Sequence, residues 1–580
     1  MREPLLRYLQ RERLAERRYE RELRALSLAE RVECGEALAG LSVVSQGGGR
    51  ITVAMSEHSA KFREGDVLWL GDGVRIEEGL PVRLVRYDGA ARQLHLELDG
   101  REEASPLRAG RELVLDRRSM DLAERFALAV EDVYTKTNHP IALCLEGKLS
   151  TDDDEAVRRE AEIDGFRRGL DRTQAAAFAR AFARPKLHMI QGPPGTGKTR
   201  LLAEILSACA ERRERVAVVA YTHRAVDQVL VRAAQRTDPR LVWKLDSSRS
   251  EAPELAAAGV RRTTSAERGA STGPAIVGLT THAACRAADR ATFDRVVFDE
   301  AGQIPLPHAV GAMRLGPRWL FVGDHAQLPP VVAGEHAEEW RASIFAHLVE
   351  RYPSTMLETT YRMNSGICDF PSRAFYAGNL KPSAEASSRR LALAPGGRFR
   401  DVLDPQRPAV LVEVPHRGAA MRSRREAAIV AELSIELMAH HRLPAEELAV
   451  IAPFRAQGMA IREELERRAA IRGFRPASWP LVETVERIQG REREVVLISL
   501  ASSDPEWLAE QTDFYFSPNR LNVALTRART KRILVASPLA FRVRARTLED
   551  VPALSVFAAL YRETPRIDGA SVEKEIEVDG

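Results

Sequence analysis

The chain has 580 residues, of which 44% are hydrophobic and 29% charged, so its apolar content excludes a disordered or fibrous protein. At roughly 150 residues per domain, this length predicts about three to five folded units. The net charge of +4 is too small to indicate a polyanionic partner, and the excess of arginine over lysine fits either many planar phosphate-binding forks or a compositional bias, which is favoured.

Five cysteines are scattered singly, without a CxxC pair, which argues against a zinc or iron–sulfur site and against a disulfide framework. No apolar run has the length of a signal peptide or of a membrane span. The sequence therefore predicts a cytoplasmic protein with no membrane partner.

The first 40 residues predict a helical segment, because Arg and Glu alternate around a few spaced apolar residues over 2–31. One apolar stripe is expected to pack on another part of the chain. A basic helix that grips nucleic acid is the alternative, but the many glutamates favour a solvated face.

Residues 41–118 predict a small β-barrel. Five short β-rich runs with glycine-rich turns between them fit such a barrel. Barrels of this size bind single strands or serve as spacers, and the sequence leaves both open. The runs are 51–53, 67–70, 82–87, 94–98 and 113–115.

From residue 119 to residue 545, apolar strands alternate with helices, which is typical of parallel sheets covered on both faces. There are more strands than one sheet usually holds, so we predict one α/β domain over 119–345, with a short insertion near 235–274, and a second over 346–545. The segment 546–580 ends in an acidic run and is expected to be a partly disordered tail.

A phosphate-binding loop follows the apolar strand at 188–190 and opens an apolar helix. Its glycines let backbone N–H groups converge on phosphate oxygens at a helix N-terminus. Lys198 is expected to reach the β- and γ-phosphates, and the hydroxyl of Thr199 to hold Mg²⁺. The nucleotide-binding set is Gly192, Pro193, Pro194, Gly195, Thr196, Gly197, Lys198 and Thr199.

Two further strand ends carry polar residues suited to the hydrolysis of a nucleoside triphosphate. Asp299 follows the strand at 296–298 and can hold Mg²⁺, while Glu300 can polarise an attacking water. Gln327, after the strand at 320–322, can bond the γ-phosphate or the water; a loop cap is its alternative reading.

Six motifs then resemble, in order, those of superfamily 1 helicases. The resemblance is to the 5′→3′ branch that contains the nonsense-mediated-decay helicase and the immunoglobulin switch-region-binding helicase. It implies two tandem RecA-like P-loop NTPase domains preceded by a helical stalk and an accessory barrel. The motifs are QGPPGTGKT (191–199), DEAGQ (299–303), GDHAQLPP (323–330), TTYRMN (359–364), TVERIQGRERE (484–494) and RLNVALTRAR (520–529).

The resemblance also implies roles for single residues around ATP. Gln174 would read the adenine edge, Tyr361 would stack near the base, and Glu492 would contact the ribose. Arg362 would contact the γ-phosphate from the second domain, and Arg527 would act as a second arginine finger.

The family's strand-facing motifs imply a set of nucleic-acid contacts. Hydroxyls and backbone amides bind phosphates without reading sequence, and aromatic rings stack on bases; a structural role is the alternative for each residue. The set is Thr222, His223, Thr280, Thr281, Pro453, Phe454 and Thr484.

Together these features predict a monomeric ATP hydrolase that moves 5′→3′ on single-stranded DNA or RNA and separates adjoining duplex, with ATP and Mg²⁺ in the cleft between the two domains. A strand-stimulated ATPase that strips proteins from nucleic acid is one rival. A subunit that binds ATP only as a switch is another, disfavoured because the catalytic set is complete.

Overall fold

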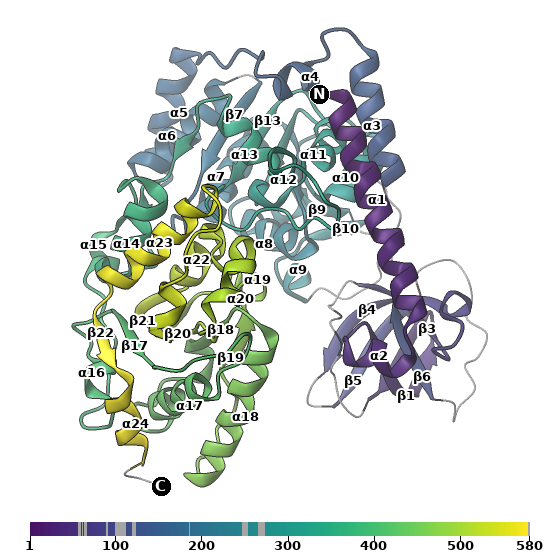
Figure 1. Cartoon of the computed structure of the whole chain (residues 1–580). Helices are drawn as coiled ribbons and strands as arrows, with labels where there is room; N and C mark the ends of the chain where they lie inside the picture. Colours follow the sequence, from purple (N-terminus) through teal and green to yellow (C-terminus); the bar gives the residue numbers. More distant parts are fainter. Residues whose placement is uncertain are drawn as a thin grey trace.

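The structure is a computed structural model of the chain (Figure 1). Two α/β domains and a closed barrel form it, and a long N-terminal helix joins the barrel to the first domain. The predicted fold class is confirmed. Within the described ranges no helix combines the length and the apolarity that crossing a membrane requires. The structure describes residues 1–55, 60, 62, 66–88, 91–98, 112–118, 123–184, 186–245, 253–264 and 273–577.

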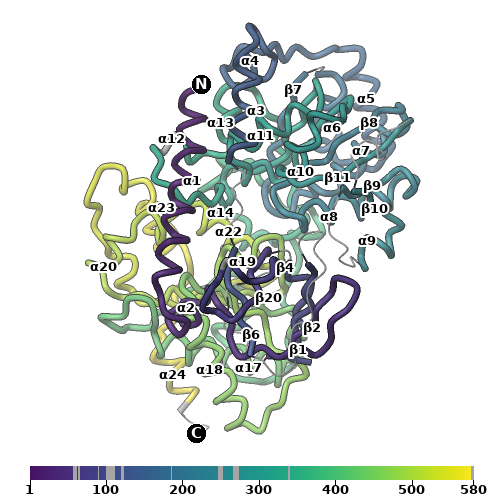
Figure 2. Tube along the Cα trace, turned by 90° about the vertical axis from the view of Figure 1, so that its right-hand side faces the viewer, coloured from purple at the N-terminus to yellow at the C-terminus, as the bar shows by residue number. Residues whose placement is uncertain are grey.

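The N-terminal helix α1 (Arg2–Ala25) is anchored in its first half, where Leu5, Tyr8 and Leu9 are buried in the core of the first domain. Farther along, the helix is mostly solvated, as its charge pattern predicts. Helix α2 (Leu28–Glu33) begins with a capping box and leads into the barrel. Figure 2 shows α1 extending from the first domain to the barrel.

The barrel closes through six antiparallel strands in the order β1-β2-β5-β4-β3-β6. Apolar side chains that alternate along each strand fill its interior. The first strand is longer than the others and was not predicted, because its Gly and Ser residues weaken the β pattern. The strands are β1 (Ala37–Gly47), β2 (Arg50–Ala54), β3 (Val67–Gly71), β4 (Leu80–Asp88), β5 (Gln93–Leu98) and β6 (Leu113–Arg117).

The first α/β domain has an eight-stranded parallel sheet in the order β10-β9-β11-β8-β12-β13-β7-β14. Its continuous apolar strands supply a core to each face, since successive side chains point to opposite sides. The strands are β7 (Leu187–Gln191), β8 (Arg215–Ala220), β9 (Val242–Leu245), β10 (Arg261–Thr263), β11 (Ala275–Thr280), β12 (Arg295–Phe298), β13 (Trp319–Gly323) and β14 (Thr355–Met356).

Helices cover both faces of this sheet (Figure 1). One face carries α1 with α3 (Ala123–Thr135), α4 (Pro140–Leu145), α10 (Thr281–Ala287), α11 (Leu306–Met313) and α13 (Ile344–Val349). The other carries α5 (Glu155–Arg167), α6 (Arg172–Ala183), α7 (Lys198–Glu211), α8 (His223–Ala234) and α9 (Pro253–Ala257).

Two segments at or between the expected domain limits join the first sheet. Strand β14 pairs with β7 and α13 packs in the core of the first domain, so this domain continues past residue 345 to Leu357. Within the insertion near 235–274, β9 and β10 extend the first sheet at its edge. Residues 246–252 and 265–272 of that insertion lie outside the described residues.

The second domain has a six-stranded parallel sheet in the order β19-β18-β20-β21-β17-β22 and a separate pair, β15 (Thr359–Thr360) with β16 (Lys381–Pro382). Its strands are β17 (Ala409–Glu413), β18 (Leu448–Ala452), β19 (Leu481–Thr484), β20 (Arg493–Ser499), β21 (Ala528–Ala536) and β22 (Arg566–Asp568). Its helices include α14 (Ser365–Tyr376), α16 (Arg400–Leu403), α17 (Arg424–Ala439), α18 (Arg455–Ile471), α19 (Val485–Ile488), α20 (Pro505–Glu510), α21 (Thr512–Tyr515), α22 (Pro518–Leu525), α23 (Asp550–Glu563) and α24 (Gly569–Glu577).

The segment after residue 545, for which the sequence predicts a partly disordered tail, forms helices and a strand in the part that the structure describes. Strand β22 pairs with β17 at the edge of the second sheet, and Phe557 and Leu560 of α23 are buried in the core. The acidic run is paired as well, since Glu573 accepts hydrogen bonds from Arg425 at 2.7 and 2.9 Å. Buried apolar side chains and ion pairs therefore fix this segment.

Candidate functional site at the domain interface

The phosphate-binding loop is shaped by two glycines with left-handed backbone. Gly195 and Gly197 have φ values of +75° and +78°, which favour glycine strongly. Gly197 is the N-cap of α7, and no side chain caps this helix, so its first amides remain available for an anion. Lys198 opens the helix, and its Nζ donates to the carbonyl oxygen of Gly192 within the loop. The loop thus offers amides and an ammonium group together.

The second domain touches this loop directly. The Thr360 hydroxyl donates to the carbonyl oxygen of Pro194 at 2.9 Å, and the Tyr361 amide donates to that of Gly195 at 2.8 Å. A Cβ atom at Gly195 would lie 2.5 Å from the Cβ of Arg362, so only glycine permits this approach. The motif TTYRMN therefore forms the opposite wall of the cleft.

Gln174 supports the loop from below. It is fully buried, its Nε2 donates to the carbonyl oxygen of Thr196 at 2.9 Å, and its Oε1 accepts from the Asp171 amide. Asp171 in turn accepts a 2.6 Å hydrogen bond from the hydroxyl of Tyr361, whose ring is 37% exposed. Burial and this carboxylate raise the pKa of Tyr361 to about 12.

The two carboxylates after β12 differ in environment. Asp299 is buried, and its pKa is raised to about 7 by burial and by the neighbouring Glu300, against the charge of Lys198. Glu300 is less buried and has a φ of +48°, a left-handed conformation that a residue with a side chain adopts only at a cost. Both acids therefore lie beside the phosphate-binding loop, where a cation would relieve their repulsion.

Two arginines of the second domain lie across the cleft from these acids. Arg362 bonds the carboxylate of Glu492 at 2.5 Å and the carbonyl oxygen of Thr526 at 3.0 Å. Although burial raises it, the pKa of Glu492 is lowered overall by the charge and hydrogen bond of Arg362. Glu492 therefore orients Arg362, while the Glu492 side chain is 42% exposed.

Arg527 is almost completely buried and forms no ion pair with any described carboxylate. Its Nε donates to the carbonyl oxygen of Val523 at 2.9 Å, and its Nη2 donates to the Thr526 hydroxyl at 3.3 Å. Burial and the charge of Arg362 lower the pKa of Arg527 to about 9, against the charge of Glu300. A buried guanidinium without a paired anion is costly, and an anionic ligand would remove that cost.

Gln327 lies at the same interface but bonds to protein. Its Nε2 donates to Asp324 at 2.7 Å, and Asp324 also accepts from the hydroxyl of Tyr376 in the second domain at 2.8 Å. Neither Asp324 nor Tyr376 is among the residues that the sequence predicts for the site. Asp324 stands in the motif GDHAQLPP, whereas Tyr376 ends an ordinary amphipathic helix and carried no signal.

The predicted nucleic-acid contacts divide into exposed and buried residues. Thr222 and His223 are exposed at the start of α8, and Pro453 and Thr484 are half-buried. Thr281 is fully buried, and the Thr280 hydroxyl accepts the Ala283 amide as the cap of α10, while a contact of these two residues with a strand stays a prediction.

Phe454 is the remaining predicted contact, and it packs into a cluster of aromatic rings. Its ring lies 5.7 Å from that of Phe514 and 6.0 Å from that of Tyr515. Trp507 completes the cluster at 5.5 Å. A base could reach Phe454 only beside these rings, of which Phe514 is 39% exposed.

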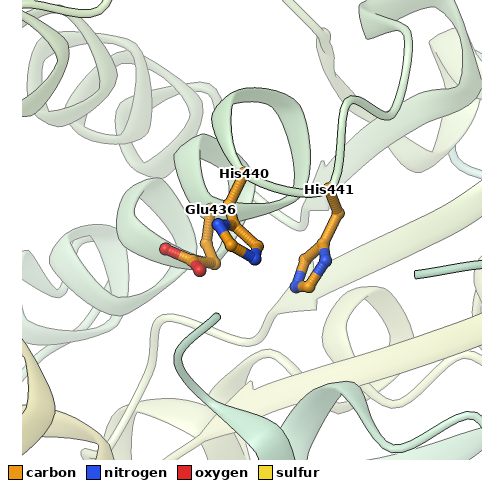
Figure 3. A group of neighbouring side chains, drawn as sticks. All are labelled: Glu436, His440 and His441. Carbon is orange, nitrogen blue, oxygen red and sulfur yellow. The ribbon is translucent and has the colours of Figure 1, made fainter. Parts of the chain in front are cut away.

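One group of three described side chains outside the cleft has spacing suited to a metal ion: Glu436, His440 and His441 (Figure 3). The imidazole of His440 lies between the Glu436 carboxylate and the ring of His441. Both carboxylate oxygens already accept hydrogen bonds from Arg398, at 2.9 and 3.1 Å, and Arg472 lies 4.0 Å away. These cations disfavour a metal, so the group serves to hold the segment around Arg398 to α17.

The two domains and their cleft define a P-loop nucleotide-binding protein. Residues 169–369 and residues 340–538 each match an AAA domain family. With these matches, the motif order and the relatives described next, the chain resembles the superfamily 1 helicases, as its motifs predict.

The relatives include two kinds of helicase. The chain is 27% identical over 418 residues to the DNA replication ATP-dependent helicase/nuclease JHS1 of Arabidopsis thaliana, covering 68% of this chain and 30% of that protein. It is 29% identical over 420 residues to the regulator of nonsense transcripts 1 homolog of Drosophila melanogaster, covering 64% and 34%. The chain thus spans about a third of the length of these relatives.

Among solved structures, the crystal structure of the arterivirus nonstructural protein 10 (helicase) is similar over 88% of this chain and 80% of that one, with 13% identity and a TM-score of 0.39.

Proposed function

We propose that the chain is an ATP-driven motor that moves 5′→3′ along single-stranded DNA or RNA as a monomer and separates adjoining duplex. The observation that carries this proposal is the convergence of both domains on one phosphate site. Lys198 and Glu300 belong to the first domain, whereas Arg362 and the uncompensated Arg527 belong to the second. A site assembled from two domains ties hydrolysis to their relative motion.

In this proposal Lys198 binds the β- and γ-phosphates, and Glu300 takes a proton from the attacking water. Gln327 positions that water or the γ-phosphate. Arg362 and Arg527 stabilise the charge that develops as the γ-phosphoryl group leaves, and they do so only when the cleft is closed. Closure would follow ATP binding, and opening would follow product release.

Mg²⁺ fits the residues present. Burial and then the charge of Glu300 raise the pKa of Asp299, and a divalent cation beside the two carboxylates would stabilise their charged forms. Asp299 and the Thr199 hydroxyl would hold the ion. When bound, Mg²⁺ would neutralise charge on the β- and γ-phosphate oxygens.

The nucleoside would lie beside the exposed face of Tyr361 and near the exposed carboxylate of Glu492. Gln174 would read the adenine edge with the amide hydrogen and the lone pair that its bonds to Thr196 and Asp171 leave over, while those two bonds support the phosphate loop.

The strand would cross Thr222, His223, Pro453 and Thr484, with Phe454 and its aromatic neighbours beside the bases. The exposure of Thr222 and His223 and the partial exposure of Pro453 and Thr484 support this path.

ATP turnover with and without single-stranded DNA or RNA tests the proposal. We expect a strand to stimulate turnover in the wild-type chain, and Lys198→Ala to abolish turnover. Lys186→Ala, which alters an exposed lysine ahead of β7, is the matched control and should leave turnover unchanged. Turnover that is indifferent to every strand would refute a nucleic-acid motor and favour the switch.

Duplexes with a single 5′ or 3′ overhang test the direction. We expect the 5′-tailed duplex to be unwound. Unwinding of the 3′-tailed duplex alone would overturn the 5′→3′ assignment.

A further inference from the structure

The loop that follows β13, residues 324–328, is held by side chains of the second domain. Asn519 Nδ2 donates to the carbonyl oxygens of His325, at 2.8 Å, and Gln327, at 2.5 Å. Asn522 Nδ2 donates to that of Ala326 at 2.8 Å. Both asparagines belong to α22, so a movement of the loop would be transmitted to this one helix.

A buried chain of hydrogen bonds runs through the same contact. Asn522 Nδ2 donates to the hydroxyl of Tyr376 at 2.7 Å, and that hydroxyl donates to Asp324 Oδ2 at 2.8 Å. The same Oδ2 accepts the amide of Gln327 at 2.7 Å. Asp324, Tyr376 and Asn522 are each at most 3% exposed, so water cannot replace these partners.

We propose that Tyr376 is a positioning residue for ATP hydrolysis, whose hydroxyl links Gln327 through Asp324 to α22 and thereby to Arg527. The proposal rests on the proposed function of the cleft. It adds a chain of contacts through which the position of the Gln327 side chain in the first domain affects Arg527, the arginine finger of the second.

The route is short at both ends. Gln327 and Tyr376 share one oxygen of Asp324, so a Gln327 amide that turns toward a γ-phosphate leaves that oxygen to Tyr376 alone. At the other end, Arg527 bonds the carbonyl oxygen of Val523, the residue next to Asn522. Burial and the Asp324 charge raise the pKa of Tyr376 well above its usual value, so its hydroxyl stays a donor.

Tyr376→Phe removes the link and keeps the ring. Asp324 then retains Gln327, and Asn522 retains Ala326, so the buried partners are not orphaned. We expect kcat for ATP to fall roughly tenfold, which corresponds to ~1.4 kcal/mol of transition-state stabilisation, with KM changed by less than about twofold.

Tyr352→Phe is the matched control. Its buried hydroxyl donates to the carbonyl oxygen of Cys144 at 2.9 Å and accepts from the Leu149 amide at 3.0 Å, all within the first domain. It should lower the melting temperature and leave kcat within about twofold. If Tyr376→Phe behaves in the same way, Tyr376 is merely structural and the proposal is overturned.

The double variant with Gln327→Ala gives the second readout. If Tyr376 acts through Gln327, the double variant will be no slower than Gln327→Ala alone; effects that multiply would overturn the proposal. A wild-type chain that hydrolyses no ATP would refute the proposed function itself, whereas active wild type with no selective effect of Tyr376→Phe would refute only this inference.

Discussion

Arg527→Met replaces a buried guanidinium with an unbranched apolar side chain. The fall in the pKa of Arg527 from 12.5 to about 9 is equivalent to about 5 kcal/mol acting against the charged form. The substitution also loses two hydrogen bonds, to Val523 and Thr526, at about 1 kcal/mol each. The difference leaves a net stabilisation of about 1–3 kcal/mol, in the range seen when buried charges become apolar.

The same substitution should abolish catalysis. An arginine finger is worth about 10³–10⁵ in kcat, so we expect at least a 10³-fold loss while ATP binding changes by less than about tenfold. Thermal unfolding without nucleotide and ATP turnover measure the two effects, and each kcal/mol should raise the melting temperature by about 2–4 °C in a domain of this size. A variant that is both more stable and inactive would show that stability is given up at this position for function.

Arg532→Met is the matched control. Arg532 is equally buried, its pKa is lowered to about 10 by burial, and it contacts carbonyl oxygens of Ile367 and Leu525 rather than a carboxylate. We expect a comparable effect on stability and a kcat within about twofold of wild type. If Arg527→Met melts below wild type, or keeps more than a tenth of its turnover, the argument that Arg527 is an uncompensated finger is wrong.

Three further outcomes follow from buried or bridging charges. Burial lowers the pKa of Lys531 from 10.5 to about 7, so between these pH values the unfolded chain binds more protons than the folded chain. The free energy of unfolding of the wild type should therefore rise between pH 7 and 9, by up to ~2 kcal/mol relative to that of Lys531→Met. If the two free energies change in parallel with pH, this reasoning is wrong. Glu12 of α1 accepts hydrogen bonds from the amides of Ala333 and Gly334 at 3.0 and 2.8 Å. Glu12→Ala should therefore speed hydrogen exchange at these two amides at least about tenfold. Unchanged protection of the two amides would show that α1 does not hold the loop around them. Glu300→Gln should bind ATP and lose at least about 10² in kcat; equal loss of binding would contradict a role in proton transfer.

The sequence predicts the architecture of the motor well, because its strands are continuous apolar runs and its motifs stand at their carboxyl ends. The phosphate loop is predictable down to Gly197, since only glycine tolerates the left-handed turn that opens α7. The strands at the sheet edges are harder to predict from the sequence. The short strands β14 and β22 have little apolar pattern, and pairing with a distant partner decides their conformation.

The exposure of single side chains could not be predicted from the sequence for a similar reason. Thr281 and Thr222 stand in comparable motifs, yet one is buried and the other exposed, because their helices pack differently. Tyr376 could not be foreseen either. Its partner Asp324 lies 52 residues earlier in the chain and in the other domain, and only the packing of the two domains brings them to 2.8 Å.

The excess of arginine over lysine becomes informative once the burial of each arginine is known. A buried guanidinium must be compensated, and the compensating group shows its role. Arg295 bonds the carboxylate of Glu214 at 3.1 Å, which is a structural pair within the first domain. Arg532 contacts backbone carbonyl oxygens of the second domain. Arg527 has neither a carboxylate nor a place remote from the cleft, and its charge acts on Glu300 across the interface. Of these three arginines, it is therefore the one whose missing anion a nucleotide phosphate would supply.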